Sequence, residues 1–407
     1  MRVCWFTSSY PRWEGDGAGI YVYSLAKHLA ALGYELEVIA PWDQALKPID
    51  TGAVRVHRYR YAPTDALHLM GHGRSLQADR RLKATVPFLV PSYVRNALAL
   101  ARQLHSVKPF ALIHGHWSVP GGFIAALEAK RTRLPYLITL HGSDAFLTSN
   151  NRLYASAAGR AFQHASFVTA VSQHLLDRSR AAGLGPSKMV VTPCGVDTER
   201  FGSGDGRAMR QRLGIDPQAK VIGAVGRLVY KKGFTHLVSA MSEVVGRLPD
   251  AYCVIAGEGD LVTELSAQIE KLGLASRVRL AGHVSWHELP DFYAMCDVVA
   301  IPSVVDITGN VDGLPNVMLE ALASTRPVVG SNIPGIDQLM RDSGGGLLVE
   351  PGSPAALADA LVELLENPAR CAALGVSGRA TMTARYTWQT IAQQFAGLYE
   401  RAARQGA

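Results

Sequence analysis

The feature that most constrains this fold is a series of short apolar segments, rich in β-branched residues, that alternate with helix-like stretches and glycine-rich turns. In the first half these segments fall at residues 3–6, 36–40, 112–114, 136–140, 167–171 and 189–192. The alternation then begins again, at residues 221–226, 251–256, 278–280, 298–301, 327–330 and 346–349. Apolar strands separated by helices are typical of parallel sheets that are covered on both faces. The sequence therefore predicts two α/β domains, each with a doubly wound parallel sheet.

Chain length and glycine content locate the domain boundary. A chain of 407 residues exceeds what one core ordinarily supports, which favours two domains. The apolar pattern breaks between residues 192 and 206, where glycines and Pro193 gather. We predict an N-terminal domain over residues 1–195 and a C-terminal domain over residues 196–385. The last stretch, 386–407, has helical spacing of its apolar residues and predicts a packed helix.

The composition is that of a compact protein with a basic surface. Apolar residues make up 48% and charged residues 18%, which leaves little room for disorder. The net charge of +7 is compatible with nucleic acid, an anionic membrane or a phosphate-bearing substrate, and does not choose among them. The five cysteines are scattered singly and indicate neither a disulfide framework nor a zinc site. Because signal-peptide and membrane-span patterns are missing from the sequence, we expect a cytoplasmic protein.

Residues 74–102 differ in character from the rest of the chain. A basic cluster of Arg74, Arg80, Arg81 and Lys83 precedes an apolar stretch that contains two prolines. Basic residues beside apolar, partly helical sequence can lie in a membrane interface, so this segment could contact the inner face of the plasma membrane. A solvated basic loop followed by a helix packed on the core explains the pattern equally well. The sequence leaves both alternatives open.

The sequence Asp-Gly-Leu-Pro-Asn-Val-Met-Leu-Glu-Ala-Leu-Ala, at residues 312–323, predicts a helix that starts near Pro315 and carries Glu320. Proline suits a first helical turn, where its missing N–H is not needed. Asp312 then lies in the preceding loop and Glu320 roughly 7 to 8 Å along the helix, so the two carboxylates could hold opposite ends of an elongated ligand. The N–H groups at the helix start would attract a diphosphate. Two acids at this spacing alone are more often an N-cap and a surface residue, and the neighbouring motifs favour the ligand site.

A second motif, Gly-Arg-Leu-Val-Tyr-Lys-Lys-Gly at residues 226–233, follows a buried strand. Ligands of open α/β sheets bind beyond the carboxyl ends of the strands, which is where Arg227 and Lys232 fall. A guanidinium and an ammonium suit the oxygens of a diphosphate and stabilise the charge of a departing nucleoside diphosphate. A solvated basic loop is the commoner role of two cations, and the position after a buried strand favours the ligand site here.

Two further loops are candidates for substrate contact. His141, Gly142, Ser143 and Asp144 follow the strand at 136–140, where a histidine can donate to a sugar hydroxyl, although a lone histidine is more often structural. The turn at residues 15–20 contains Gly17 and Gly19 and precedes a predicted helix, so its amides could approach a phosphate or a sugar ring. It lacks the complete dinucleotide-binding pattern, which makes a nicotinamide enzyme an unfavourable interpretation.

Taken together, these motifs resemble glycosyltransferase family 4 over nearly the whole chain. The residues that carry the resemblance are Gly17 and Gly19, HGSD from His141, PCGVDTERF from Pro193, GRLVYKKG from Gly226, AGEG from Ala256 and DGLPNVMLEALA from Asp312. The resemblance implies the GT-B fold, in which two Rossmann-like domains face each other across a cleft. It implies an acceptor mostly on the first domain and a nucleotide-sugar on the second. The last helix is expected to cross back to the N-terminal domain.

The resemblance also implies a role for each candidate residue. Arg227 and Lys232 would hold the donor diphosphate, Asp312 would meet hydroxyls of the transferred sugar, and Glu320 would meet the nucleotide ribose. His141 would line the reaction centre. The smaller contributions would be backbone approach to phosphate at Gly17 and Gly19, a backbone contact with the base at Val284, and sugar or phosphate contacts at Gly313, Leu314, Pro315 and Asn316.

Two positions depart from the pattern of the family. Asp312 stands where a glutamate is usual, one methylene longer, so the identity of the sugar stays open. Asp16 precedes Gly17 where many relatives have paired glycines, and the phosphate contacts of that loop are correspondingly less defined.

The function implied by the resemblance is that of a retaining glycosyltransferase that needs no metal. It would move a hexose from a UDP- or GDP-sugar to a glycan, a lipid-linked or a small-molecule acceptor in cell-envelope polysaccharide or glycolipid synthesis, with no nucleic-acid partner. The chain has no Asp-x-Asp triplet, so Arg227, Lys232 and the helix start would take the part of a cation beside the phosphates. A GT-B sugar-nucleotide epimerase, which needs no acceptor, and a non-catalytic nucleotide-sugar-binding protein are the alternatives.

Overall fold

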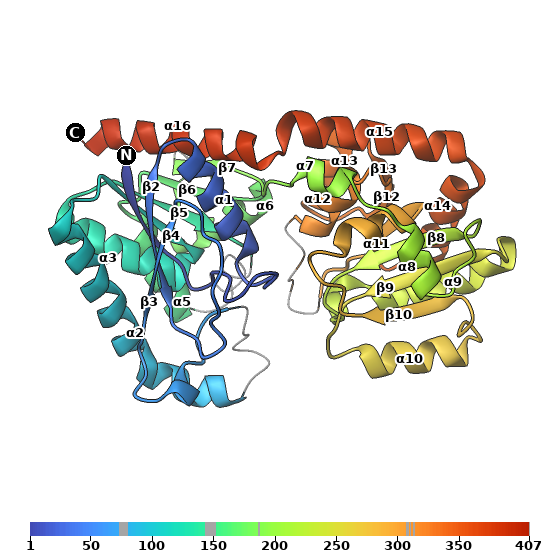
Figure 1. The fold of residues 1–407 in the computed structure, drawn as a ribbon, viewed down its shortest axis with the longest axis horizontal. Coiled ribbons are helices and arrows are strands. Elements are labelled where there is room, and N and C mark those ends of the chain that lie inside the picture. Colours follow the sequence, from blue (N-terminus) through green and yellow to red (C-terminus); the bar gives the residue numbers. More distant parts are fainter. Residues whose placement is uncertain are drawn as a thin grey trace. The chain divides into compact units, whose positions relative to one another are not determined.

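The computed structural model describes residues 1–72, 80–142, 152–185, 188–306, 309, 311 and 314–406, without the side chains of residues 80–84, 181 and 406. The chain divides into two compact units. Unit 1 contains Met1–Cys194 and Trp388–Ala407, and unit 2 contains Gly195–Thr387. Figure 1 shows the elements of both units.

Unit 1 is built on a seven-stranded parallel sheet with the strand order β3-β2-β1-β4-β5-β6-β7. The strands are β1 (Arg2–Phe6), β2 (Glu35–Pro41), β3 (Arg55–Tyr59), β4 (Leu112–His116), β5 (Tyr136–Leu140), β6 (Phe167–Ala170) and β7 (Met189–Val191). The α-helices are α1 (Ile20–Ala31), α2 (Arg80–Val107), α3 (Phe123–Thr132), α5 (Arg152–Phe162), α6 (Gln173–Ser179) and α16 (Trp388–Gly406). Shorter turns of helix are η1 (Asp65–Leu67), η2 (Trp117–Gly122) and η3 (Arg180–Ala182).

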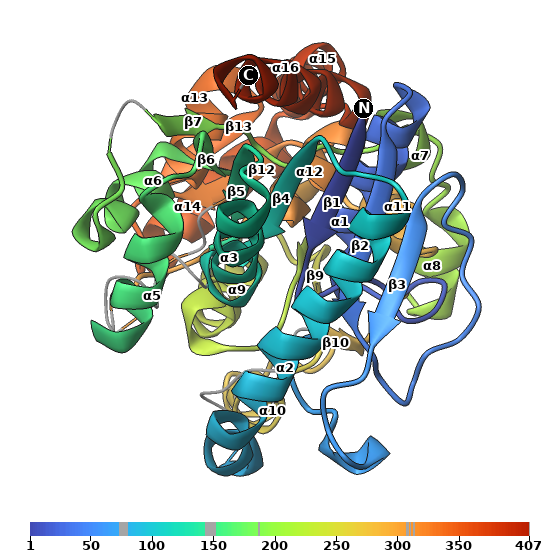
Figure 2. The same cartoon turned by 90° about the vertical axis from the view of Figure 1, so that its left-hand side faces the viewer.

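Alternate residues of the central strands enter two different cores, because successive side chains of a strand point to opposite faces. Phe6 and Ile113 pack with residues of α2, α3 and α5 on one face, the face in front of the sheet in Figure 2. Trp5 and Leu112 pack with α1 and α16 on the other face. The last helix of the chain thus returns to unit 1 and covers the face that carries His114 and His116.

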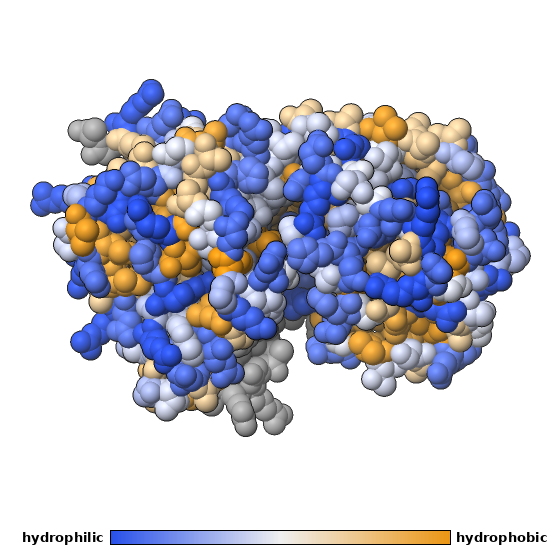
Figure 3. All heavy atoms as spheres, in the orientation of Figure 1, coloured by the Kyte–Doolittle hydropathy of each residue, from blue (hydrophilic) through white to orange (hydrophobic). Residues whose placement is uncertain are grey.

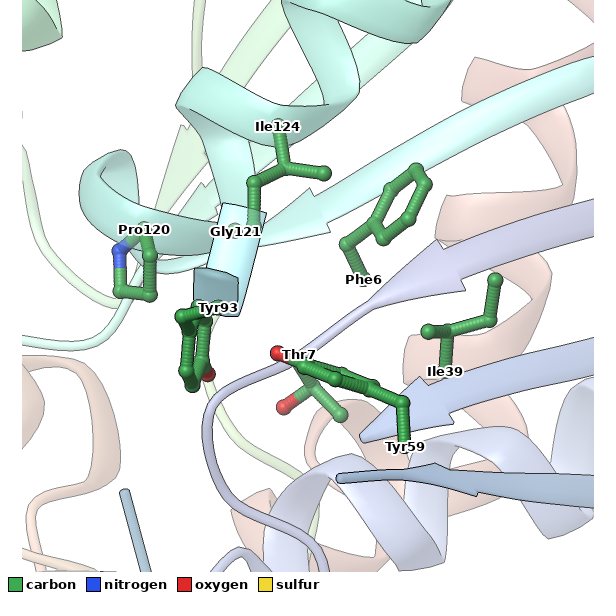
Figure 4. Close-up of a pocket in the computed structure, with 8 residues that line it drawn as sticks. All are labelled: Phe6, Thr7, Ile39, Tyr59, Tyr93, Pro120, Gly121 and Ile124. Carbon is green, nitrogen blue, oxygen red and sulfur yellow. The ribbon is translucent and has the colours of Figure 1, made fainter. Parts of the chain in front are cut away.

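The helix α2 is fixed to the sheet by aromatic packing at the ends of the first strands. Tyr93 of α2 meets Tyr59 of β3 edge to face, with ring centroids 5.2 Å apart. Figure 4 shows both rings beside Thr7, with Phe6 and Ile39 of the neighbouring strands close by. Leu89 is also buried in this core.

From residue 80 onward the segment 74–102 is the helix α2, which packs on the core through Leu89 and Tyr93. Arg80, Arg81 and Lys83 therefore belong to a helix and not to the predicted basic loop, whereas Arg74 lies outside the described residues. The packing of α2 leaves the membrane contact an open alternative.

Unit 2 contains a six-stranded parallel sheet with the order β10-β9-β8-β11-β12-β13. The strands are β8 (Lys220–Val225), β9 (Ala251–Ala256), β10 (Val278–Gly282), β11 (Val298–Ile301), β12 (Val328–Ser331) and β13 (Gly346–Val349). The helices are α7 (Thr198–Gly202), α8 (Arg207–Arg212), η5 (Tyr230–Lys232), α9 (Phe234–Arg247), α10 (Val262–Lys271), α11 (Leu289–Met295), α12 (Asn316–Ala323), α13 (Ile336–Ser343), α14 (Pro354–Glu366) and α15 (Pro368–Arg385).

Helices cover both faces of the second sheet as well. Residues of α9, α10 and α14 form a core against one face. On the other face α11 lies so close to β8 that a Cβ at Gly223 would be 2.3 Å from the Sγ of Cys296. Glycine at this position therefore sets the distance between α11 and the strand, and α11 carries a residue of the candidate site.

Every apolar segment predicted as a strand forms one, and β3 is the strand that the sequence analysis missed. The sequence of β3, Arg-Val-His-Arg-Tyr, contains three polar residues and only two that are apolar or aromatic. An edge strand tolerates such polar residues, so β3 lacks the continuous apolar run that indicates a buried strand.

Among the described residues, none of the helices is both long enough and apolar enough to cross a bilayer. In the space-filling view of Figure 3, hydrophobic residues form separate patches among hydrophilic ones.

Candidate functional site

The carboxyl ends of β8, β9 and β10 in unit 2 are joined by backbone hydrogen bonds. Gly226 N donates to Ala256 O at 3.0 Å, and Gly257 N donates to Gly282 O at 2.7 Å. A Cβ at Gly257, whose φ is +140°, would be 1.9 Å from Gly226 O. Side chains cannot fit at this crossing, so glycine allows the two loops to meet. The loop that follows β8 is held in one place as a result.

Arg227 and Lys232 both lie on this loop, as the sequence predicts. Arg227 is exposed and Lys232 is half-buried. The stem of Lys232 passes over Gly226, where an added Cβ would be 3.3 Å from the lysine Cε. The turn then closes at Gly233, which has a φ of +67° and lies so close to Pro302 O that a Cβ would be 1.9 Å from it. Lys232 is therefore positioned by backbone constraints on both sides.

Glu320 lies inside α12 and belongs to the same neighbourhood as Lys232. The hydroxyl of Tyr293, on α11, donates to one carboxylate oxygen of Glu320 at 2.8 Å. Burial raises the pKa of the Glu320 carboxyl, against the lowering effect of the Tyr293 hydrogen bond and of the positive charges of Arg200 and Lys232. The site thus combines one carboxylate with cations from two other elements.

Arg200 extends this cluster toward the end of β10. It donates to Trp286 O at 2.7 Å, and its guanidinium carbon lies 3.2 Å from the centroid of the Trp286 ring. Asp197 caps α7 by accepting from Arg200 N at 3.0 Å. Val284, the candidate for a base contact, is buried in the same turn after β10. Stacking and hydrogen bonding fix Arg200, because a planar guanidinium can do both at once.

The helix α12 begins at Asn316, one residue after the predicted start, and Pro315 is its N-cap residue in an extended conformation. Proline belongs there for the same reason that it suits a first turn, since neither position needs its N–H. Leu314 and Asn316 are half-buried and Pro315 is buried. Asp312 and Gly313 lie outside the described residues.

In unit 1, the loop before α1 is organised by Asp16. Its carboxylate accepts from the guanidinium of Arg12 at 2.7 Å and from Ala18 N at 3.1 Å. Burial alone would raise the pKa of Asp16, and these hydrogen bonds hold it below its usual value. Gly19 caps α1 with a φ of +77°, and a Cβ there would be 2.5 Å from Ser9 O. Gly17 has open space around it, so its backbone is the accessible part of the loop.

His141 is surrounded by aromatic rings. Its ring centroid lies 4.7 Å from that of Tyr21, 4.4 Å from that of Trp117 and 5.3 Å from that of His116. Trp117 has a φ of +63°, which is unfavourable for a residue with a side chain and persists only where the surroundings impose it. The strained backbone places the indole against His141, and such strain often marks functional sites.

Behind His141 lies a buried chain of hydrogen bonds that ends on α16. His114 Nδ1 is 2.7 Å from the Tyr399 hydroxyl, and His114 Nε2 is 2.7 Å from the Thr139 hydroxyl. The Thr139 hydroxyl is in turn 2.7 Å from that of Thr169. Burial lowers the pKa of His114 to about 3, so its ring is neutral at physiological pH. The chain links β4, β5 and β6 to the last helix.

A cavity on the same face of unit 1 connects the histidines with α16. His116 and His141 line it together with Tyr21 from α1, and Trp388, Ile391 and Phe395 line it from α16. Of the predicted site residues of unit 1, His141 follows β5, and Gly17 and Gly19 precede α1, whose Tyr21 contacts the ring of His141. Those of unit 2 that the structure describes, Arg227, Lys232, Val284, Leu314, Pro315, Asn316 and Glu320, lie on loops at the carboxyl ends of the second sheet and on the start of α12.

Comparison with known proteins identifies the family of this chain. Residues 15–200 match the family model described as Glycosyltransferase Family 4, and residues 205–381 match the model described as Glycosyl transferases group 1. The chain belongs to glycosyltransferase family 4. It is a glycosyltransferase, and the resemblance described above is confirmed.

Individual relatives agree with this family. The D-inositol 3-phosphate glycosyltransferase of Kineococcus radiotolerans is 29% identical over 96% of this chain and 91% of its own length. A GDP-mannose-dependent alpha-(1-6)-phosphatidylinositol monomannoside mannosyltransferase of Mycolicibacterium smegmatis is 36% identical over 60% of this chain and 64% of its own length. The crystal structure of Anabaena Alr3699/HepE in complex with UDP has a TM-score of 0.75 at 22% identity, covering 98% of this chain and all of that one. The predicted GT-B fold, with two Rossmann-like domains, is confirmed.

Three residues of this glycosyltransferase that the sequence analysis did not single out hold the candidate residues in place. Tyr293 contacts Glu320, Arg200 adds a cation beside it, and His116 contacts His141. A signal existed for His116, because His114 and His116 are two residues apart at the end of a strand and must share one face. Tyr293 gave no such signal, since one tyrosine on an amphipathic helix is ordinarily a core residue.

We predict that replacing Tyr293 with phenylalanine raises the pKa of Glu320 further. The substitution removes a donor that stabilises the carboxylate and leaves the buried ring in place. The measurement is a pH titration of side-chain ¹³C resonances in protein labelled at glutamate, with the signal assigned by Glu320→Gln. Tyr252→Phe is the matched control, since Tyr252 lies on β9 and its ring packs against the guanidinium of Arg277. An unchanged or lowered pKa in Tyr293→Phe would contradict the prediction.

Proposed function

We propose that this glycosyltransferase transfers a hexose, with retention of anomeric configuration, from a UDP- or GDP-sugar bound on unit 2 to a hydroxyl of a glycan or lipid acceptor. The observation that carries the proposal is that Lys232 lies near enough to Glu320 for its positive charge to lower the pKa of that carboxyl, beside the carboxyl ends of a parallel sheet. A cation suits the diphosphate of a nucleotide-sugar, and a carboxylate suits the vicinal hydroxyls of a ribose.

The roles of the residues follow from their chemistry. Lys232 and Arg227 would neutralise the diphosphate, and Asp312 would meet hydroxyls of the sugar. Tyr293 occupies one oxygen of Glu320 as a donor, which leaves the carboxylate able to accept from a ribose hydroxyl. The backbone at Val284 would meet the base, and that at Gly313 to Asn316 the sugar or phosphate.

Unit 1 supplies neutral groups in this proposal. His141 would donate a hydrogen bond to a hydroxyl of the bound substrate, and the amides near Gly17 and Gly19 would approach its phosphate. Relatives described as GDP-mannose-dependent mannosyltransferases act on phosphatidylinositol monomannoside, and the HepE structures contain UDP or UDP-glucose. These neighbours favour a nucleotide-sugar donor and a role in glycan or glycolipid synthesis.

We further propose that the reaction uses no metal and no protein nucleophile. The acceptor hydroxyl would attack the anomeric carbon on the side from which the diphosphate departs. The new bond joins the acceptor oxygen to the anomeric carbon, the bond from that carbon to the phosphate oxygen breaks, and the acceptor proton passes to the departing diphosphate. Arg227 and Lys232 would stabilise the negative charge that develops on that leaving group.

A screen of UDP- and GDP-hexoses with glycan and lipid acceptors tests the reaction. We expect transfer from at least one donor, a product anomer with the same configuration as the donor by NMR, and a rate that a chelator such as EDTA leaves unchanged. An inverted product would exclude retention, and loss of activity with EDTA would exclude a metal-independent step. Conversion of the nucleotide-sugar to an isomer without any acceptor would instead identify an epimerase.

Lys232→Ala should lower kcat by about 100- to 1000-fold, the usual effect of removing a group that stabilises charge in the transition state. Lys220→Ala is the matched control, because Lys220 lies at the opposite, amino end of the same strand. Transfer kinetics and circular dichroism are measured for both variants. Full activity of a folded Lys232→Ala protein would remove the proposed diphosphate site.

The membrane contact of residues 74–102 is a second part of the proposal. Phe88 is 84% exposed on α2, although its neighbour Leu89 is buried in the core. The anchored helix therefore holds an aromatic ring outward, a few residues after Arg80, Arg81 and Lys83 in the sequence. Aromatic and basic residues together suit an anionic lipid surface, where the acceptor of a glycolipid-forming enzyme would be found.

We expect the protein to co-sediment with vesicles that contain phosphatidylglycerol at low salt and to be released as salt rises. Phe88→Ser should weaken this binding about three- to tenfold, because less apolar surface enters the interface. Val107→Ser, which changes a side chain that is 82% exposed at the other end of α2, should bind like the unaltered protein. Absence of salt-sensitive binding in the unaltered protein would remove the membrane contact from the proposal.

A further inference from the structure

His116 and His141 form a hydrogen-bonded pair at the ends of two adjacent strands. His116 is the last residue of β4 and pairs with Thr139 of β5, and His141 follows two residues later on the same face. The Nδ1 of His116 lies 3.1 Å from the Nε2 of His141, with the two rings nearly parallel at 20°. One of these two nitrogens must carry the shared hydrogen.

Both imidazoles are neutral, which restricts where their protons can be. His116 has no exposed surface. Burial lowers the pKa of His141 to about 3 and that of His116 well below its ordinary value, and the neighbouring rings lower the latter further. A neutral imidazole has one N–H donor and one acceptor nitrogen. Fixing the proton of one ring in the pair therefore fixes the proton of the other.

The second nitrogen of His116 decides between the two arrangements. Its Nε2 is buried and has no hydrogen-bond partner within the part of the chain that the structure describes. If His141 donated, His116 would carry its own proton on this Nε2, and a buried N–H would be left unpaired. If His116 donates from Nδ1, only an acceptor lone pair is left, which costs less than an unpaired N–H.

We infer that His116 is a positioning residue that donates from Nδ1 to the Nε2 of His141 and thereby holds His141 in the Nδ1–H tautomer. In this state the lone pair of His141 is occupied and its own proton is on Nδ1. His141 is then a hydrogen-bond donor and cannot take a proton from a substrate. The stacking of Trp117 and Tyr21 on the same ring keeps its orientation.

The consequence for the reaction rests on the proposed function. A histidine that acts only as a donor can hold a sugar hydroxyl and cannot serve as the general base for the acceptor. The proton of the acceptor hydroxyl must then pass to another group. In the proposed reaction that group is the departing diphosphate. His116 would therefore affect turnover through His141 without touching the substrate itself.

Long-range ¹H–¹⁵N NMR of protein labelled at histidine reads the tautomer directly, without substrate. We expect the Nε2 of His141, assigned with His141→Gln, to resonate as an unprotonated ring nitrogen. In His116→Phe, which keeps a ring and removes the donor, the His141 signals should move toward the Nε2–H tautomer. His116→Asn, whose amide can donate from near the position of Nδ1, should restore the original signals.

Thr192→Val is the matched control. The Thr192 hydroxyl is buried beside the same cavity and lacks a hydrogen-bond partner among the described residues, so its removal should leave His141 unchanged. An Nε2–H tautomer of His141 in the unaltered protein would overturn the inference. Unchanged NMR signals of the His141 ring nitrogens in a folded His116→Phe protein would also overturn it.

Kinetics separate this inference from the proposed function. His116→Phe should lower kcat roughly five- to tenfold, with a smaller change in the donor KM, and His116→Asn should recover most of the loss. If the unaltered protein transfers no sugar from any donor, the proposed function fails while the tautomer result stands. If transfer is normal and the tautomer differs from expectation, only the role of His116 is lost.

Discussion

The arrangement of both candidate clusters depends on one constraint, that parallel strands end at a common edge and alternate their side chains between two faces. In unit 1 this places His114, His116, Thr139 and His141 on the face covered by α1 and α16. In unit 2 the loops after β8 and β9 meet at Gly226 and Gly257, where a side chain could not fit. The backbone contact at these glycines fixes the start of the loop that carries Lys232.

The last helix contributes to the candidate site of unit 1 although it is far in sequence from His116 and His141. Tyr399 bonds to His114 across 285 positions, and Trp388, Ile391 and Phe395 close the cavity beside His116 and His141. Burial lowers the pKa of His114 and His116, and Phe395 and Tyr399 of this helix pack against the ring of His114. A truncation before residue 388 would therefore remove the burial on which their protonation states depend, as well as part of the core.

The sequence predicted the strands whose residues are mostly apolar, because burial on both faces favours apolar residues at most positions. It missed β3, an edge strand in which Arg55, His57 and Arg58 interrupt any apolar run. The family resemblance predicted Arg227, Lys232 and Glu320 as site residues, and their roles stay predictions, while Asp312 lies outside the described residues. Tyr293 and Arg200 could not be predicted, since their contacts depend on how α11 and α7 pack beside α12, and such contacts leave no local pattern.

The two units differ in the kind of polar group that they supply, and this difference has a physical reason. Unit 2 provides the cationic side chains of Arg227, Lys232 and Arg200, of which Arg227 is exposed to water. Unit 1 provides histidines whose burial makes them neutral. A doubly charged diphosphate needs cationic side chains, because neutral donors could not compensate its charge. A sugar hydroxyl needs neutral hydrogen-bonding groups, because a cation buried beside it would lose hydration that a single neutral hydroxyl cannot replace.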